Sequence, residues 1–565
     1  MIQTIQGLNL ESEISRVKIS LNGNNIGDIT ELLDTISSLH TIFINEYTIS
    51  PSLLTISSKL PFLWRESAET LQKLSKQEIT LNQAKELIIN VLINKRIKSM
   101  STISLLQSCM KKNLEITPSI IESAEMITEK EETGKGANRY FTLGCGRGSQ
   151  ITCSAASTKD AYIAQKLQRD KWITNTFLQR LGMTLPKWEL LPNKSYIKKV
   201  WDKYEKPVVI KPTGLTAGKG VTVGIDTIQK AQDAFDYAKA AIDTRVRQSW
   251  QEKIMIQEQV YGEDYRLLVI NGKLQIATKR IPAFVTGDGS KSIKELIEQE
   301  NSDPRRDIKN PAHILKPIKI DEPLIKYLTQ QNLTLDSIPE KGQRVYVRKV
   351  ASMSQGGITQ DFTDSVCKEI KSIVETIATS MHAFTLGVDV MCKDISKPLT
   401  KSNGAILEVN TMPETYLNMY PVLGTQREYV ADIYIDELLK ENKCKRFVVV
   451  GQSTNDVSTL LRKKNIIKEN EDVGELIDDR YLINGIEINR NLTRWRATEA
   501  IKCNAYLDTI ILHYRNWNEV IEHGLGFDYI NLLCITKDLS NDKENMKIVK
   551  RYKKKKLIDK IKILK

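Results

Sequence analysis

Residues 387–413 constrain the fold of this chain more than any other stretch. They contain two runs of apolar and β-branched residues, 387–391 and 405–413, which flank a loop rich in Lys, Pro, Ser, Asn and Gly. Two such runs joined by a polar loop are typical of a β-hairpin. The stretch therefore predicts two neighbouring strands.

Three oxygen-bearing side chains lie in these predicted strands: Asp389 in the first run, and Glu408 and Asn410 in the second. Glu408 and Asn410 are two residues apart, so their side chains leave the same face of a strand. Mg²⁺ is bound by oxygen ligands, usually one or two carboxylates together with nucleotide phosphates. The three residues are a candidate metal site, and the alternative is the solvated polar edge of an ordinary hairpin.

A second stretch places lysines and glycines where phosphate could bind. Residues 206–212 predict a strand that contains Lys211, and a glycine-rich loop, residues 213–221, follows it. Glycines allow backbone N–H groups to approach phosphate oxygens, and lysines add positive charge. The spacing differs from that of a P-loop, and a glycine-rich loop by itself is a weak signal.

A third stretch, residues 255–266, precedes the apolar run 267–270. In this order the three stretches resemble the ATP-grasp superfamily. Further motifs narrow the resemblance to the ATP-grasp domain of cyanophycin synthetases, and glutathione-type ligases share part of the pattern. These motifs are Gly287-Asp288-Gly289-Ser290, Asp303-Pro304-Arg305-Arg306, Ala312-His313 and the run from Val347 to Gly357. The similar region extends from about Tyr140 to about Leu439.

The resemblance implies a site for ATP with Mg²⁺, for which Mn²⁺ is a substitute. Lys171 and Lys211 match the lysines that hold the α- and β-phosphates, although the residues alone would make Lys171 an ordinary solvated helix lysine. Asp264 occupies the ribose-binding position. Gln257, followed by Glu258, occupies the adenine-facing position, where glutamate is commoner. The loop expected to close over the γ-phosphate contributes Gly214, Gly218, Lys219 and Gly220.

The resemblance also implies two catalytic residues on the acceptor side. Arg348 matches an arginine that neutralises the carboxylate or acyl phosphate, for which a guanidinium offers a fork of donors. His313 matches a histidine near the acceptor. The alternatives are an exposed strand arginine and a structural loop histidine. In the implied reaction ATP converts a carboxylate into an acyl phosphate, which an amine attacks to form an amide, while the protein positions the reactants and stabilises charge.

Three residues depart from the family pattern near the acceptor. Ala161 stands where the family usually has a serine that helps to hold the growing polymer, and an alanine side chain cannot form hydrogen bonds. Ser352 replaces an asparagine, and Glu414 replaces a glycine next to the candidate metal ligands. The departures are compatible with ATP binding, but they put the acceptor and turnover in question.

The 565 residues predict a multidomain α/β protein with two to four domains. Residues 1–138 predict a mainly helical domain that ends in a charged linker, residues 129–136. Residues 139–440 are expected to form the ATP-grasp fold. Residues 441–542 resemble the start of a Mur-ligase domain, the usual second half of cyanophycin synthetases, and residues 543–565 form a basic tail.

The Mur-like segment lacks the chemistry of its family. A predicted strand, residues 445–450, is followed by Gly451, but the expected Gly-Lys-Thr core is missing and Asp456 would repel phosphate. The segment is therefore interpreted as an inactive, truncated remnant. The tail, with four consecutive lysines at 553–556, predicts a solvated segment with a helical stripe of Ile548, Tyr552 and Leu557, and an anionic polymer is the alternative partner.

The composition fits a nucleotide enzyme. The 82 basic and 69 acidic residues give a net charge of +13, which favours anionic partners but is too dispersed to indicate nucleic acid. The eight cysteines form no CxxC pair, and the chain shows no signal peptide or long apolar run, so a cytoplasmic protein without a membrane partner is expected.

The predicted function is an ATP-dependent ligase that joins amino-acid or peptide substrates. The alternatives are a glutathione-type or other amino-acid ligase, and a nucleotide-binding scaffold without turnover. The sequence leaves the oligomeric state open, and a homo-oligomer is compatible with it.

Overall fold

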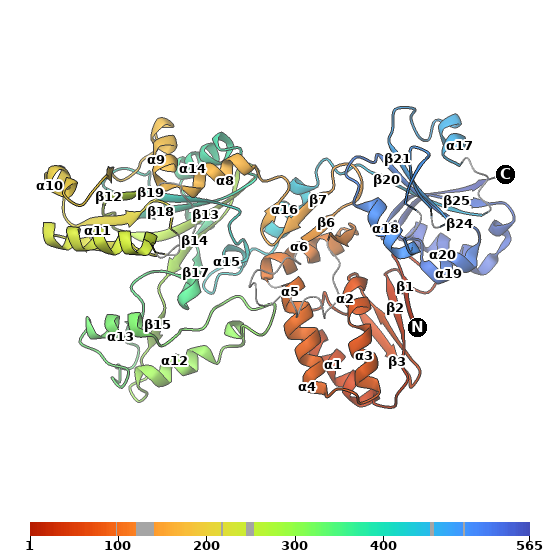
Figure 1. Ribbon diagram of the computed structural model, residues 1–565, viewed down its shortest axis with the longest axis horizontal. Coiled ribbons are helices and arrows are strands. Elements are labelled where there is room, and N and C mark those ends of the chain that lie inside the picture. The colour runs from red at the N-terminus through yellow and green to blue at the C-terminus, as the bar shows by residue number, and fades with distance from the viewer. Residues whose placement is uncertain are drawn as a thin grey trace. The chain divides into compact units, whose positions relative to one another are not determined.

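The computed structural model describes residues 1–97, 99–119, 140–215, 218–243, 253–451, 457–478, 480–489 and 492–564. Two compact units are present (Figure 1). The central unit contains residues 159–308 and 313–430, and the terminal unit contains residues 1–158, 309–312 and 431–565. Residues 140–158, which were assigned to the ATP-grasp domain, thus group with the terminal unit. The predicted linker 129–136 lies outside the described residues.

The central unit is built on two antiparallel sheets. The larger has the order β17-β14-β13-β18-β19 and the smaller the order β11-β10-β12-β9. The larger sheet is formed by β13 (Glu263–Ile270), β14 (Lys273–Ile281), β17 (Ile358–Asp361), β18 (Thr385–Cys392) and β19 (Gly404–Thr411). The smaller sheet is formed by β9 (Trp188–Leu191), β10 (Val208–Pro212), β11 (Thr222–Ile225) and β12 (Ile254–Glu258). The hairpin predicted at 387–413 is confirmed as β18 and β19, and the strand predicted at 206–212 as β10.

Each sheet has one apolar face that a helix covers. In the larger sheet Tyr265, Leu267 and Val269 alternate along β13 and pack in one core with Ile370 and Val374 of α14. The opposite face of that sheet is left for the polar residues of the same strands. The helices of this part are α8 (Tyr162–Arg169), α9 (Lys171–Arg180), α10 (Tyr196–Val200), α11 (Ile228–Asp243), α14 (Lys368–Ser380) and α15 (Tyr416–Met419).

A small lobe within the central unit has its own core. It pairs β15 (Phe284–Thr286) with β16 (Arg344–Tyr346) and adds α12 (Ile293–Asn301) and α13 (Glu322–Thr329). Val285, Ile297 and Leu324 are among the residues buried together there. Arg348 lies two residues after the end of β16, so this lobe determines its position.

The amino-terminal part of the terminal unit contains the predicted helices and also a sheet that the sequence did not predict. The sheet is antiparallel, in the order β1-β2-β4-β3, with bounds β1 (Ile2–Ile5), β2 (Arg16–Ser20), β3 (Glu46–Ile49) and β4 (Leu53–Ser57). The helices are α1 (Ile26–Leu39), α2 (Pro61–Glu66), α3 (Ala68–Ser75), α4 (Leu81–Lys85), a π-helix (Glu86–Ile93), α5 (Asn94–Arg96) and α6 (Met100–Lys111). A further small sheet joins β5 (Ile116–Pro118), β6 (Tyr140–Leu143), β7 (Gln150–Cys153) and β8 (Ala156–Ser157).

The carboxy-terminal part of the terminal unit is an α/β domain with a sheet in the order β23-β22-β21-β24-β20-β25-β26. The strands from β21 to β26 in this order are parallel, whereas β22 and β23 are antiparallel to their neighbours. Its strands are β20 (Lys445–Val450), β21 (Val473–Ile477), β22 (Arg480–Ile483), β23 (Ile486–Asn489), β24 (Thr509–Tyr514), β25 (Ile530–Thr536) and β26 (Ile558–Leu564). Its helices are α17 (Val457–Lys463), α18 (Arg494–Lys502), α19 (Trp517–His523) and α20 (Lys543–Lys554). The preceding helix, α16 (Val430–Leu438), is bonded through Asp432 to Ser108 of α6.

The prediction of a solvated basic tail is wrong. Residues 543–554 form α20, and residues 558–564 form β26, which pairs with β25 along the edge of the sheet. Tyr552 is fully buried and its hydroxyl donates to the carbonyl of Asn9 at 2.6 Å. The lysines lie on the exposed face of the helix, so they make the segment basic without keeping it out of the fold.

No helix in the described ranges combines the length and the apolar character that a membrane span needs.

Candidate functional site

The polar face of the larger sheet gathers the charged residues of four neighbouring strands. Arg266 on β13 lies directly opposite Asp389 on β18, which in turn lies opposite Glu408 on β19. On the other side, Asp264 of β13 lies opposite Arg280 of β14. Because directly opposed residues share a face, and residues two apart along a strand do too, these five side chains lie on one face of the sheet, where two arginines and three carboxylates are neighbours.

Asp389 is buried, with 6% of its surface exposed, and is held by two arginines. The Arg266 Nε donates to Oδ1 and its Nη2 donates to Oδ2 at 3.1 Å, which is the paired geometry that a guanidinium forms with a carboxylate. Burial raises the pKa of Asp389, but Arg266 and Arg280 together lower it by more than burial raises it. The pKa of Asp389 therefore lies below the ordinary value. The residue is therefore a carboxylate at neutral pH.

Arg280 connects Asp389 with a second carboxylate. Its Nη2 donates to Asp264 Oδ1 at 2.6 Å and to Asp389 Oδ2 at 3.1 Å. Burial raises the pKa of Asp264, and the charge of Arg280 and its hydrogen bond oppose this rise. The position predicted to bind ribose and the position predicted to bind metal are thus joined through one guanidinium.

The three candidate metal ligands share this face. Asp389 lies opposite Glu408, and Asn410 is opposite Gly387 two positions further along β19. The register shifts between Asp389 and Val390, so that Leu407 is left without a partner in a β-bulge beside Glu408. Two carboxylates and an amide supply the hard oxygen atoms that Mg²⁺ or Mn²⁺ accepts, and phosphates would complete the shell. In the described part of the chain no group of three His, Cys, Asp or Glu residues could hold a metal ion, and the predicted set contains two carboxylates and the amide of Asn410.

Lys171 is the first residue of α9 and links this face to the glycine-rich loop. Its backbone N–H donates to the carbonyl of Thr213 at 3.0 Å, and its ammonium donates to the carbonyl of Leu215 at 2.9 Å. The ammonium also lies 3.5 Å from the Glu408 carboxylate. The contacts place a lysine between the predicted phosphate loop and a predicted metal ligand, and a solvated helix lysine would not make them.

Lys211 lies on β10 and shares the site with Lys171. Burial, and to a smaller extent the positive charge of Lys171, lower the pKa of Lys211 to about 8, although the Glu408 carboxylate acts in the opposite direction. An ammonium that is poorly solvated and close to a like charge is stabilised by an anion, and a phosphate is the anion that the sequence predicts here.

The glycine-rich loop is described only in part, because Thr216 and Ala217 lie outside the described residues. Gly218 and Gly220 adopt φ angles of +73° and +70°, which favour glycine. A Cβ on Gly220 would lie 2.8 Å from Cγ of Pro212, so the close approach of the loop to β10 also requires glycine. Gly214 and Lys219 belong to the same loop, and the role of all four residues at phosphate stays a prediction.

The predicted adenine-facing position is occupied by a buried amide. Gln257 is 3% exposed, and its Oε1 finds no hydrogen-bond partner among the described residues. It lies on the same face of the smaller sheet as Lys211, because Val209 is directly opposite Gln257. Glu258 points elsewhere and accepts the backbone N–H of Lys187 at 3.0 Å, which ties β12 to the start of β9.

The two predicted catalytic residues are engaged by the protein itself. The Arg348 guanidinium is 4% exposed and donates to both oxygens of Asp321, at 2.7 and 2.9 Å, and to the carbonyl of Lys319 at 2.6 Å. The exposed strand arginine that was the alternative is therefore excluded. His313 is buried, and its Nε2 accepts from the Lys316 ammonium. Both contacts stabilise the local fold, and the catalytic roles stay predictions.

Arg266 and Arg280 are the residues of this site that the sequence reasoning missed. A signal was present, since Asp264 and Arg266 alternate with Tyr265 and Leu267 just before the apolar run 267–270, and this alternation is typical of a strand. Another unassigned residue, Asp160, accepts from the Oγ1 of Thr385 at 3.2 Å and so fixes the start of β18. Ala161 is the residue that precedes α8, and it packs against the core of the larger sheet.

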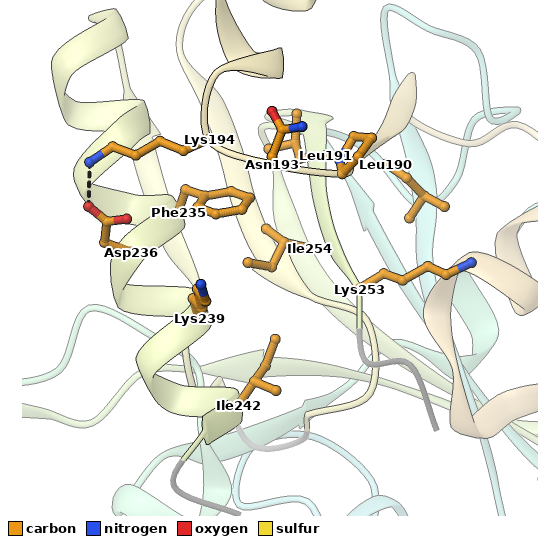
Figure 2. A pocket seen from close by; sticks show the side chains of 11 residues that line it. Leu190, Leu191, Asn193, Lys194, Phe235, Asp236, Lys239, Ile242, Lys253 and Ile254 are labelled. Carbon is orange, nitrogen blue, oxygen red and sulfur yellow. Dashed lines mark hydrogen bonds and ion pairs between the residues drawn. The ribbon is translucent and has the colours of Figure 1, made fainter. Parts of the chain in front are cut away.

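A separate cavity of about 760 Å³ lies on the opposite face of the smaller sheet (Figure 2). Its wall includes Leu191, Phe235 and Ile254, and a pair between Lys194 and Asp236 lies at its rim. Leu191 and Ile254 belong to the core under α11, whereas Lys211 and Gln257 are on the other face of the strands. The cavity is therefore distinct from the predicted nucleotide site.

Comparisons with known proteins agree with the geometry. Residues 169–281 match the family model of the phosphoribosylglycinamide synthetase ATP-grasp (A) domain. The chain is 32% identical over 359 residues to the cyanophycin synthetase of Geminocystis herdmanii. The aligned segment covers 62% of this chain and 40% of that protein. It is 33% identical over 328 residues to the cyanophycin synthetase of Crocosphaera subtropica, covering 58% and 37%.

Relatives with a glutathione-synthesising function are also found. The glutathione biosynthesis bifunctional protein of Clostridium perfringens is 29% identical over 291 residues, or 51% of this chain and 36% of that protein. A solved bifunctional glutathione synthetase from Pasteurella multocida is 25% identical, with a TM-score of 0.47, and covers 66% of this chain and 47% of its own. The matches span about two fifths of the length of the cyanophycin synthetases. Residues 169–281 are therefore similar to an ATP-grasp domain, and about three fifths of the chain is similar to cyanophycin synthetases.

Proposed function

We propose that this protein is an ATP-dependent ligase that joins a carboxylate to an amine through an acyl phosphate. The proposal is supported mainly by the charged face of the larger sheet, on which Asp389 and Glu408 lie opposite each other. Lys171 of α9 forms an ion pair with Glu408 on this face. Relatives named cyanophycin synthetase and glutathione biosynthesis protein support the same class of reaction.

The chemistry assigns separate tasks to the lysines beside this face and to the oxygen ligands on it. Lys171 and Lys211 supply positive charge for the phosphates, and Asp389, Glu408 and Asn410 would hold Mg²⁺ or Mn²⁺. A bound divalent ion neutralises the β- and γ-phosphates and so favours attack by a carboxylate. The two sheets and α9 would hold these groups in place before the substrates bind, and positioning together with charge stabilisation is what such a reaction needs.

The substrates are proposed to be amino acids or peptides, in a cytoplasmic setting. A glutathione-type or other amino-acid ligase is the second candidate, because such relatives match half of the chain. A nucleotide-binding scaffold without turnover is the third, and Glu414 beside the metal ligands favours it. The carboxy-terminal domain is proposed to be a degenerate Mur-like domain. Its glycine-loop region, residues 452–456, lies outside the described residues.

The deciding experiment is a screen for amino acids and dipeptides that stimulate ADP formation, with mass spectrometry of the products. A ligase yields a product whose mass equals the two substrates minus water, in equal amount to ADP. Glu408→Gln is the matched inactive control. Binding of ATP without stimulated ADP formation by any substrate pair would favour the scaffold, and no ATP binding at all would refute the proposal.

A further inference from the structure

One guanidinium serves two carboxylates that belong to opposite ends of the predicted nucleotide site. Nη2 of Arg280 donates to Asp264 Oδ1 at 2.6 Å and to Asp389 Oδ2 at 3.1 Å. Nε of Arg280 is buried and has no hydrogen-bond partner among the described residues. The hydrogen bonds of this partly buried arginine to side chains thus go to these two carboxylates.

The two carboxylates depend on Arg280 to different degrees. Asp389 is held independently by Arg266, which donates to both of its oxygens. Asp264 has one ion-pair partner among the described residues, and that partner is Arg280. A change at Asp389 can therefore reach Asp264 through Arg280, while Arg266 keeps Asp389 in place.

We propose that Arg280 is a positioning residue that couples the metal end of the nucleotide site to the ribose end. This inference rests on the proposed function, in which Asp389 binds the metal ion and Asp264 binds the ribose hydroxyls. A divalent cation on Asp389 repels the guanidinium and weakens its bond to that carboxylate. Arg280 then donates more fully to Asp264 and fixes this carboxylate for the sugar.

The coupling has a definite sign and is reciprocal. Metal binding increases the contribution of the ribose hydroxyls to nucleotide affinity, and by linkage the ribose hydroxyls increase metal affinity. The hydroxyl contribution is measured as the ratio of the affinities for ATP and 2′,3′-dideoxy-ATP, which differ only at the sugar. The expected increase in this ratio when metal is added is at least about fivefold, the lower end of typical coupling between sites.

The test measures nucleotide binding by calorimetry with the full chain, in EDTA and with saturating Mn²⁺. Arg280→Lys is the test variant, because a single ammonium cannot reach both carboxylates as the planar guanidinium does. Arg266→Lys is the matched control, because Arg266 contacts Asp389 but not Asp264. The Arg266→Lys variant should bind metal more weakly, but metal should still increase the ratio of the affinities for ATP and 2′,3′-dideoxy-ATP. In the Arg280→Lys variant metal should no longer change this ratio.

Asp264→Asn provides a second route if Arg280→Lys does not fold. It keeps the shape of the side chain and removes the charge that Arg280 contacts, so the ratio should become insensitive to Mn²⁺. A wild-type ratio that is unaffected by Mn²⁺, or an Arg280→Lys protein with the wild-type response, would overturn the coupling and leave the proposed function intact. A wild-type chain that binds neither nucleotide would overturn both.

Discussion

The Lys171 ammonium and the Glu408 carboxylate lie 3.5 Å apart, and they join the first turn of α9 to β19. The same ammonium donates to the carbonyl of Leu215 in the glycine-rich loop. Without a nucleotide, a predicted phosphate ligand is thus neutralised by a predicted metal ligand. When a metal ion binds Glu408, Lys171 loses its ion-pair partner and becomes available to phosphate. A phosphate-binding lysine and a metal-binding carboxylate can therefore neutralise each other while the site is empty.

Replacing Glu408 by glutamine should abolish ADP formation while the fold is retained. The amide is a weaker metal ligand than the carboxylate. Mutating a residue that only orients a metal ligand typically lowers metal affinity or activity by about 10–100-fold. Because Glu408 is proposed to be a ligand itself, the rate should fall by more than about a hundredfold. ADP release and circular dichroism on the same sample check this. Glu263→Gln, on an exposed side chain of β13, is the control and should behave like the wild type. Normal turnover of Glu408→Gln would remove the ligand assignment.

Replacing Lys211 by alanine should weaken ATP binding severely. A positive charge at about 4 Å from a phosphate in a partly buried site is worth up to about 4 kcal/mol, so the Kd should rise by as much as about a thousandfold. Calorimetric titration with ATP measures the effect. Lys194→Ala is the matched control, because Lys194 pairs with Asp236 on the other face of the smaller sheet and should leave the Kd unchanged.

Lys211 should also make both stability and ATP affinity depend on pH. Its pKa in the folded chain is about 8, against an ordinary value of 10.5. The unfolded chain therefore binds more protons between these values, and the free energy of unfolding of the ligand-free protein rises with pH in this window. Phosphate favours the charged form, so ATP affinity should fall as the pH increases through about 8.

The control for this pH dependence is Lys211→Arg, whose guanidinium remains charged throughout the range. Urea unfolding and ATP titration at a series of pH values should show both trends in the wild type and neither in the variant. Identical pH profiles for the two proteins would mean that another group is responsible.

The strand pattern made part of this site predictable. Asp389, Glu408 and Asn410 alternate with apolar residues, so their strands and their shared face follow from the period of two. The pairing of Arg266 with Asp389 could not be predicted, because these residues are 123 positions apart and only the register of β13 and β18 brings them together. The same limit applies to Arg348, whose partner Asp321 is supplied by the start of α13.

The carboxy-terminal segment shows the opposite kind of error. Its run of lysines dominated the composition, while Met546, Val549 and Tyr552, spaced three apart, already indicated a helix with one buried face. The following strand, β26, contains the exposed Lys560 and the partly exposed Lys562. It joins the sheet by parallel pairing with β25, which no local pattern reveals. Charge at an edge strand is common and does not exclude it from a sheet.

Replacing Tyr552 by phenylalanine tests whether this segment is part of the fold. The change removes the hydrogen bond to the Asn9 carbonyl and leaves that buried acceptor unpaired, which should lower the free energy of unfolding by about 1–3 kcal/mol. Chemical denaturation of the full chain measures it. Tyr506→Phe, at a residue that is 75% exposed, is the control and should have no effect. Equal stabilities of the two variants would restore the interpretation as a solvated tail.

The last prediction concerns Arg348, whose guanidinium is held by Asp321 in this structure. If it faces the acyl phosphate during the reaction, Arg348→Ala should preserve ATP affinity and slow the chemical step. The loss of one such donor costs about 10²–10³-fold in rate, or roughly 3–4 kcal/mol. Arg348→Lys should restore little of the lost rate, because an ammonium cannot reproduce the planar fork of donors of the guanidinium.

Asp321→Asn separates this catalytic role from the structural one. It removes the ion pair but retains the guanidinium, so it should lower stability as Arg348→Ala does, while the rate of the chemical step in the folded protein remains close to the wild type. The measurement is single-turnover amide formation beside nucleotide titration and urea unfolding. If Arg348→Ala and Asp321→Asn lose stability equally and both retain the wild-type rate, Arg348 is only a structural partner of Asp321. Weakened ATP binding in Arg348→Ala with an unchanged chemical rate would place this arginine on the nucleotide side instead.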